Sequence, residues 1–121
     1  MGMRVTDADV EQDDDGTVLY RGAPYTGEVV EVAPGGTVVA LVTYHRGREH
    51  GPWCEWYPDG TPRVEGRVEF GRGAVGTWRT WHANGRLAEE HEFDDLGRRR
   101  AERRWDSEGT PTAERVYPDP A

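Results

Sequence analysis

The sequence contains no lysine and no isoleucine, and only one cysteine and one serine among its 121 residues. Without lysine there is no P-loop, no Schiff-base lysine and no pyridoxal phosphate site. The single cysteine, Cys54, cannot form a disulfide within the chain and cannot by itself build a zinc ribbon or an iron–sulfur centre. We therefore expect neither a cofactor nor a bound metal.

Long apolar runs are also missing. No stretch of about 18 apolar residues is available to span a membrane. The first 15 residues hold six acidic side chains against one arginine, without the apolar segment of a secretion signal. Residues 1–6 fit the loose N-myristoylation pattern, which is a low-information match. We expect a cytoplasmic protein without membrane contact.

Aliphatic side chains and phenylalanine are scarce as well. Leucine, isoleucine, valine and phenylalanine make up about 16% of the residues, and the net charge is −8, a combination typical of disordered chains. Five tryptophans and five tyrosines argue against disorder. The length suits one small domain. We expect it to fold around a thin core.

The tryptophans belong to a repeat of 24–25 residues. Residues 51–61, GPWCEWYPDGT, align with residues 76–86, GTWRTWHANGR, and weaker copies begin at Gly27 and Arg100. The sixth position of each unit is apolar: Val32, Trp56, Trp81 and Trp105. The tenth position is a turn glycine: Gly36, Gly60, Gly85 and Gly109.

Each unit is typical of a β-hairpin. Asp-Gly and Asn-Gly pairs supply the positive φ of hairpin turns, and a second glycine leads into the next unit. The predicted fold is mainly β: a single-layer antiparallel β-meander of about four hairpin repeats. Residues 98–105 have a charge pattern that would also suit a short helix.

We expect three segments: an acidic N-terminal arm (1–17), a repeat domain (18–117) and a tail (118–121). The units lie near 27–50, 51–75, 76–99 and 100–117. The sixth-position residues are interpreted as a structural ridge, since tryptophan supplies much buried area in a thin sheet. The third position ends in an acid, Glu102, which indicates a partly covered face. Trp53 and Trp78 at that position are therefore candidates for partner contact.

Catalytic groups do not converge in the sequence. Ser107 sits in a turn, and Cys54 has no neighbouring cation to activate its thiol. With the turn at Asn84-Gly85, His82 is predicted to face Leu87, so His82 and His91 are not partners for a metal. We expect a protein that is not an enzyme.

The charges are unevenly distributed. Residues 1–15 carry a net charge of −5, and Asp13, Asp14 and Asp15 are predicted to steer a basic partner. Five arginines within residues 98–104 are able to contact phosphate, yet acidic residues adjoin them. We expect that stretch to pair with acids rather than with nucleic acid directly.

The pattern Gly-x-Trp-x-x-Trp-x-x-[Asp/Asn]-Gly resembles the bacterial variant of the MORN repeat (membrane occupation and recognition nexus). Residues 19–27 and 104–110 are similar to the small YwqK-type antitoxins. Val29 and Val32 depart from the pattern, and the last unit lacks its opening glycine. The resemblance implies an immunity protein that binds and sterically inhibits a cognate toxin, such as a deaminase or nuclease with a basic cleft.

On that hypothesis the contact residues are Trp53, Glu55, Tyr57 and Trp78. The three aspartates of the arm attract the basic partner toward them. The alternative is a non-catalytic MORN-repeat scaffold or a membrane-associated assembly protein. A meander has two open edges, and edge pairing gives a dimer unless charged terminal strands prevent it, so the oligomeric state stays open.

Overall fold

The computed structural model describes residues 3–118, and within them the chain is nearly all β. Residues 1–2 of the myristoylation pattern and residues 119–121 of the tail therefore fall outside the described residues. One 3-10 turn, η1 (Asp7–Asp9), lies among twelve strands. The strands are β1 (Arg4–Thr6), β2 (Val10–Gln12), β3 (Val18–Tyr20), β4 (Ala23–Pro24), β5 (Gly27–Val32), β6 (Val38–His45), β7 (Arg48–Trp56), β8 (Pro62–Glu69), β9 (Gly73–Trp81), β10 (Leu87–Phe93), β11 (Arg99–Trp105) and β12 (Pro111–Val116).

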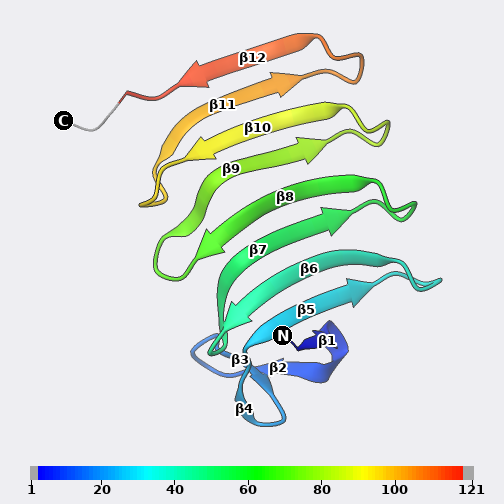
Figure 1. The fold of residues 1–121 in the computed structure, drawn as a ribbon, viewed down its shortest axis with the longest axis vertical. Helices are drawn as coiled ribbons and strands as arrows, with labels where there is room; N and C mark the ends of the chain where they lie inside the picture. The colour runs from blue at the N-terminus through cyan, green and yellow to red at the C-terminus, as the bar shows by residue number, and fades with distance from the viewer. Residues whose placement is uncertain (1–2, 119–121) are drawn as a thin grey trace.

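Nine of these strands form one sheet in the order β1-β5-β6-β7-β8-β9-β10-β11-β12. From β5 onward each strand pairs antiparallel with the next, so the hairpins stack in chain order (Figure 1). The predicted β-meander of hairpin repeats is confirmed. The parallel pairing of β1 with β5 is an addition that the repeat did not predict. No helix in residues 3–118 is long and apolar enough to cross a bilayer.

Residues 99–105 form β11, so the alternative of a short helix there is wrong. Hydrogen-bonded neighbours lie on both sides of this strand, β10 and β12. Arg103 stands opposite Glu90 of β10 and Glu114 of β12, and Arg104 stands opposite Glu89 of β10. These cross-strand pairs stabilise the extended backbone at a segment whose charge pattern alone is ambiguous.

The hairpin turns of the four units share one geometry, at residues 33–37, 57–61, 82–86 and 106–110. In each, the first N–H donates to the fifth carbonyl, and the N–H of the fourth residue, a glycine, donates to the first carbonyl. Gly60 has φ of +92°, whereas the non-glycine residues with positive φ in the described chain are Arg21 and Arg46. At 57–61, 82–86 and 106–110 this is a type I turn with a glycine bulge, in which only the glycine needs positive φ. At 33–37 Gly35 also has positive φ, +103°. Asp59 and Asn84 instead accept a backbone N–H through their side chains.

Each hairpin also contains a bulge, which corrects one predicted pairing. Trp81 lies opposite Leu87, and the next pair is Thr80 with Glu89, so Ala88 is an extra residue on β10. His82 therefore does not face Leu87; it begins the turn. The repeat alignment cannot reveal an extra residue that occurs at the same place in every unit, and this one shifts the register by one.

Aspartates in the turns make the fold sensitive to acid. Backbone N–H groups of Thr61, Arg98 and Thr110 lower the pKa of Asp59, Asp94 and Asp106, respectively, below its ordinary value of 3.8. A carboxylate whose pKa is lower in the folded state stabilises the fold above the unfolded pKa, and that stabilisation is lost as the pH falls through the folded pKa.

We therefore expect the melting temperature to fall steeply below about pH 4, the ordinary range of aspartate. Asp106→Asn keeps an acceptor for the turn N–H groups but does not titrate, so this variant should lose less between pH 7 and pH 3. Thermal unfolding followed by circular dichroism at both values measures the difference. Asp95→Asn, at an exposed position outside these turn hydrogen bonds, is the control. An equal drop for wild type and Asp106→Asn would contradict the assignment.

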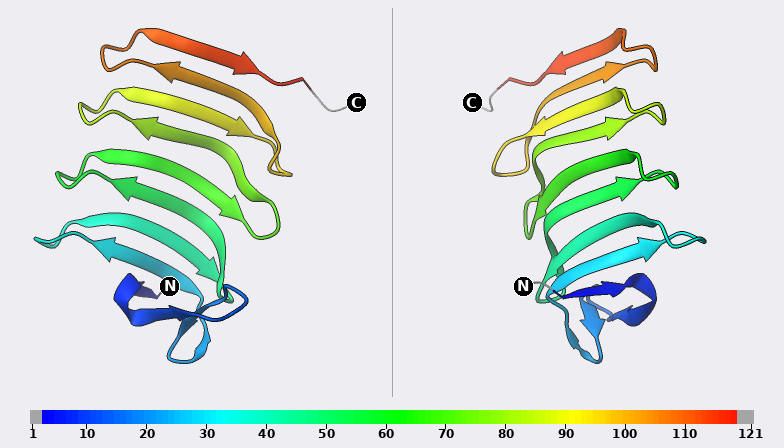
Figure 2. Two further views of the ribbon diagram at one scale, coloured as in Figure 1. Left: turned by 180° about the vertical axis from the view of Figure 1, so that it is seen from behind. Right: turned by 45° about the vertical axis from the view of Figure 1, so that its right-hand side comes forward.

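The apolar core lies at the N-terminal end of the stack. Val5 and Val29 of the large sheet pack with Val18 and Tyr25, and Tyr25 is only 2% exposed. Val18 belongs to a second sheet, β2-β3-β4, which lies beside the first strands of the large one (Figure 2). The small sheet thus covers one face of β1 and β5, and we call this the platform face because Trp53 and Trp78 also lie on it.

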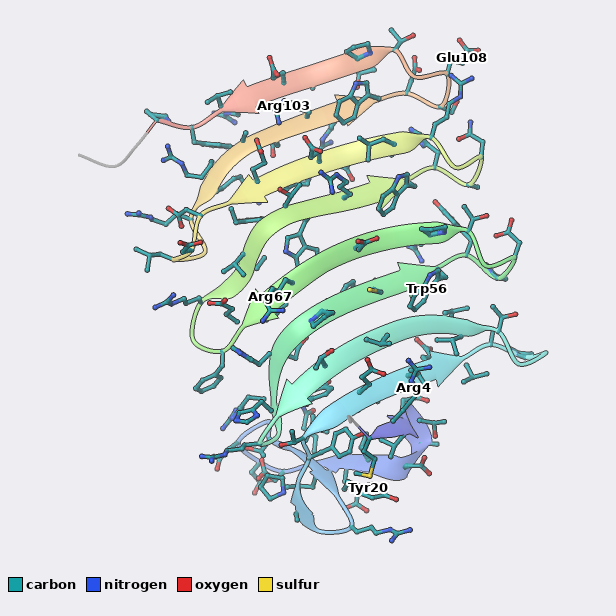
Figure 3. The ribbon with its side chains drawn as sticks, viewed as in Figure 1. Arg4, Tyr20, Trp56, Arg67, Arg103 and Glu108 are labelled. Atoms are coloured by element: carbon teal, nitrogen blue, oxygen red, sulfur yellow. The ribbon has the colours of Figure 1, made fainter. Side chains whose placement is uncertain are left out.

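The opposite face is called the ridge face, after Val32, Trp56, Trp81 and Trp105. Strand alternation places these four residues there, each beside its hairpin turn, as Trp56 shows in Figure 3. Trp56 stands opposite Pro62, and Trp81 opposite Leu87. All three tryptophans are half-buried, whereas Val32 is exposed. The four residues thus share one face, and their role as a structural ridge stays a prediction.

Candidate aromatic binding surface

Trp53 and Trp78 lie side by side on the platform face. They come from β7 and β9, which flank β8, and their ring centroids are 5.4 Å apart with planes inclined by 42°. The residue of β8 between them is Gly66, directly opposite Trp53. A Cβ added at Gly66 would lie 2.1 Å from Cδ2 of Trp78. The Trp78 indole therefore rests on the backbone of β8.

A hydrogen bond fixes this arrangement. Nε1 of Trp78 donates to the carbonyl oxygen of Arg67 at 3.1 Å. The indole is thus held at its edge by Arg67 and from below by Gly66, so it is ordered before any partner arrives. Ordered aromatic rings bind with a small loss of conformational entropy. Sequence reasoning missed Gly66, although an isolated glycine inside a strand pattern is a signal for close approach to its backbone.

The surface continues from Trp78 onto β10, where the sequence indicated no site. His91 stands opposite Trp78, and its ring stacks with Phe93 at 6.5 Å between centroids. Its two nitrogens lie 3.7 Å from Glu89 and 3.6 Å from Glu102. The Nδ1 atom is buried and lacks a hydrogen-bond partner within the described residues. Aromatic and acidic side chains therefore share the platform face from β7 to β11.

Glu55 is on the same face as Trp53, two residues along β7. Its carboxylate lies 3.4 Å from Arg63. A shallow hollow adjoins Trp53, and both Glu55 and Glu31 line it. The structure thus brings together three of the predicted contact residues, Trp53, Glu55 and Trp78, with a second glutamate beside them.

Tyr57 lies elsewhere. It begins the turn at 57–61, and its hydroxyl donates to the carbonyl oxygen of Trp81 at 2.7 Å. His82 occupies the same place in the next unit, with Nε2 lying 2.9 Å from the carbonyl oxygen of Trp105. Because a carbonyl only accepts, His82 must carry its proton on Nε2. In this position the Tyr57 side chain links successive hairpins through a hydrogen bond.

The three predicted steering aspartates form the turn between β2 and β3. Oδ1 of Asp13 accepts the N–H groups of Asp15 and Thr17, and Arg48 donates to the carbonyl oxygen of Asp15 at 3.0 Å. Asp14 lies between them, exposed. The acidic residues are thus part of an ordered turn at the N-terminal end, separate from the tryptophans on β7 and β9.

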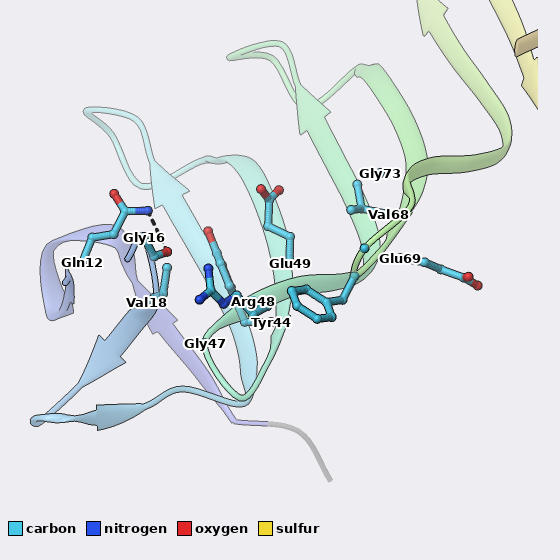
Figure 4. A pocket seen from close by; sticks show the side chains of 12 residues that line it. Gln12, Gly16, Val18, Tyr44, Gly47, Arg48, Glu49, Val68, Glu69 and Gly73 are labelled. Atoms are coloured by element: carbon cyan, nitrogen blue, oxygen red, sulfur yellow. Dashed lines mark hydrogen bonds between the residues drawn. The ribbon is translucent and has the colours of Figure 1, made fainter. Parts of the chain in front are cut away.

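A pocket opens beside this turn, between the small sheet and the turn that follows β8 (Figure 4). Tyr44, Arg48, Glu49 and Phe70 are among its lining residues. Burial, followed by the charge of Glu49, raises the pKa of Tyr44, so its phenol stays protonated at neutral pH. Within residues 3–118, no group of three or more His, Cys, Asp or Glu side chains is placed to hold a metal ion.

Cys54 lies on the ridge face, opposite Leu41 and Glu65. Burial raises the pKa of its thiol, and the charges of Glu65 and Glu28 raise it further. The thiol therefore stays protonated and weakly nucleophilic near neutral pH. Ser107 accepts a hydrogen bond from Asn84 through its backbone carbonyl, at 2.7 Å, within the adjoining turns.

Fold and site together define a repeat protein, a single layer of stacked β-hairpins with an aromatic surface. A family profile described as MORN repeat variant matches residues 49–68 and 74–95, so the chain contains MORN-type repeats in its second and third units. These two segments carry Trp53 and Trp78.

Other comparisons give little more. No curated protein matches the chain significantly. One solved structure, a mutant of S. aureus TarM in complex with fondaparinux, alpha-GlcNAc-glycerol and UDP, is 10% identical with a TM-score of 0.42. The match covers 88% of this chain and 19% of that one. A likeness at this TM-score carries no weight for fold or function.

Proposed function

We propose that this chain is a non-catalytic immunity protein that binds a bacterial toxin in the cytoplasm and blocks its active cleft sterically. The observation that carries the proposal is the Trp53–Trp78 pair, preordered by Gly66 on a sheet face that the small sheet leaves open beyond the first strands. Aromatic anchors of this kind contribute about 2 kcal/mol or more each at the centre of a protein interface.

The charges favour a basic partner. The chain has a net charge of −8, and Glu31, Glu55, Glu89 and Glu102 surround the tryptophans on the platform face. An enzyme that modifies nucleic acid, such as a deaminase or nuclease, has a basic cleft where these carboxylates would replace phosphates. The acidic turn at 13–15 then accelerates encounter through long-range attraction. This proposal also follows the resemblance to the YwqK-type antitoxins.

A scaffold protein is the second candidate. The matched MORN-type repeats and the long sheet are compatible with a structural role in an assembly. Such a role requires self-association or a membrane partner and gives no protection against a toxin. The same experiment therefore separates the two candidates.

The test is co-expression with a candidate toxin domain, sought among the reading frames that adjoin this gene. Wild-type protein should restore growth and form a stoichiometric complex on a sizing column. Trp53→Ala should weaken that complex by about 30-fold, equivalent to about 2 kcal/mol, because it removes one aromatic anchor. Isothermal titration calorimetry measures the affinity, and circular dichroism checks the fold.

Phe70→Ala is the matched control, since it removes a ring that is 65% exposed in a turn outside the platform face. Its affinity should equal that of wild type. Unchanged affinity in Trp53→Ala would overturn the platform as the contact surface. Absence of both rescue and complex with wild-type protein would overturn the immunity function and favour the scaffold.

A further inference from the structure

A row of alternating charges crosses the ridge face from β8 to β12. Glu65, Arg79, Glu90, Arg103 and Glu114 stand directly opposite one another on successive strands. Arg79 lies 3.1 Å from Glu90, and Arg103 lies 3.2 Å from Glu90 and 3.0 Å from Glu114. Hydrogen bonds to Glu92 and then Glu114 raise the pKa of Arg103, which is labelled in Figure 3. Each inner member of the row has an opposite charge on both sides.

Glu114 ends the row with a basic neighbour on one side only. It belongs to β12, the edge strand, and its side chain is 65% exposed. Tyr117 N–H donates to the carbonyl of Arg100, toward β11. Because these bonds alternate along an antiparallel strand, the N–H and C=O groups of Glu114 and Val116 point away from β11. The edge therefore presents outward-pointing backbone N–H and C=O groups next to the Glu114 carboxylate, which has an arginine on one side only.

On the platform face, the residue at this edge is basic and its neighbour on β11 is acidic. Arg115 lies on that face and stands opposite Glu102 of β11. Beyond Arg115 there is no further strand within the described residues. The edge thus presents an acid on one face and a base at the next position on the other face.

A second copy of this chain does not match this pattern. When two copies of β12 pair antiparallel edge to edge, the residue opposite Glu114 comes from the same face of the other copy. The choices are Thr112, Glu114 and Val116, and none is basic. Like charges directly opposite one another destabilise a strand pair. Pairing of two β12 edges is therefore disfavoured. The other open edge, β1, has a base in Arg4, but Met3 precedes it and supplies no acid opposite Arg115, so a different strand is required to match both charges.

We propose that the edge of β12 is a docking site for an extended segment of a partner protein, which adds antiparallel as a tenth strand of the sheet. The segment carries arginine or lysine opposite Glu114, preceded by aspartate or glutamate on the other face, opposite Arg115. Main-chain hydrogen bonds supply affinity and the two charges set the register, as in other cases of strand addition. This proposal does not rest on the immunity function, because it uses a different surface.

The test appends a strand to the full chain. The segment Thr-Val-Glu-Arg-Val-Thr is fused after Ala121 through a flexible Gly/Ser linker, so that antiparallel docking places its arginine opposite Glu114 and its glutamate opposite Arg115. A short linker gives an effective concentration in the millimolar range. Amide hydrogen exchange by NMR at Glu114 and Val116 should slow by about tenfold, equivalent to about 1.4 kcal/mol.

The matched control is the same fusion with Glu and Arg exchanged, Thr-Val-Arg-Glu-Val-Thr, which has an identical composition and opposes like charges. It should leave exchange at Glu114 and Val116 unchanged. Protection by neither fusion, or equal protection by both, would overturn the proposal. Trp53→Ala should leave the protection intact, which separates this result from that of the proposed function.

Discussion

Tyr25→Ala should lower the free energy of unfolding by about 3–5 kcal/mol, the range for removing a large buried aromatic side chain. Tyr25 is 2% exposed and packs in the apolar cluster formed by Val5, Val18 and Val29. A domain of this size has a total stability of about 5–15 kcal/mol, so this loss removes a large share of it. Urea denaturation followed by circular dichroism measures the change.

Tyr25→Phe separates the ring from the hydroxyl. The Tyr25 hydroxyl lies 2.9 Å from the carbonyl oxygen of Glu28 and 3.0 Å from that of Met3, so its loss should cost about 1 kcal/mol. Phe70→Ala removes an exposed ring and should change stability by less than about 0.5 kcal/mol. If Tyr25→Ala cost no more than Tyr25→Phe, the small sheet would not be the supporting layer of the molecule.

Gly66→Ala should destabilise the protein by about 1–3 kcal/mol, because its Cβ overlaps the Trp78 indole. In a Trp78→Ala background the same change should reverse sign and stabilise by about 0.5–1 kcal/mol. Alanine is the better residue in a strand once the indole is gone, since glycine loses more backbone entropy on folding. Gly66 does not have positive φ, so its backbone accepts alanine.

A double-mutant cycle measures this coupling from urea denaturation of the four proteins. If the proposed function holds, Gly66→Ala should also weaken binding of the proposed toxin, since it displaces the ring that Arg67 holds at its edge. Additive effects of the two substitutions would show that the indole does not rest on Gly66. In that case Trp78 would have no fixed orientation before binding.

Features that recur within one hairpin were predictable from the sequence. The tenth-position glycines lie in the turns as expected, and the spacing of Trp53 and Trp78 from their unit starts places both on one face. Strand alternation has a period of two, so residues at the same position within each hairpin unit face the same side of the sheet. By contrast, the parallel pairing of β1 with β5 involves residues outside any repeat, and no local pattern records it.

The remaining errors come from register. The bulge at Ala88 moves His82 off Leu87 and decides which residues meet across β9 and β10. A separate register shift between Glu92 and Phe93 lies in the pairing of β10 with β11. His91 and Glu102 were both visible in the sequence, but their contact at 3.6 Å depends on a pairing between two strands. The arginines of residues 98–104 were expected to pair with acids, and Arg103 does so on three glutamates, Glu90, Glu92 and Glu114.

Because the apolar core lies at the N-terminal end, we expect local stability to fall along the stack toward β12. Each hairpin touches only its neighbours, so the stack behaves as a one-dimensional chain of coupled units. The first units are supported by buried valines and Tyr25, while the last ones depend more on exposed ion pairs that salt screens. Fraying should therefore start at β12 and travel inward, sooner at high ionic strength. A strand docked on β12 would therefore protect the end of the sheet at which unfolding begins.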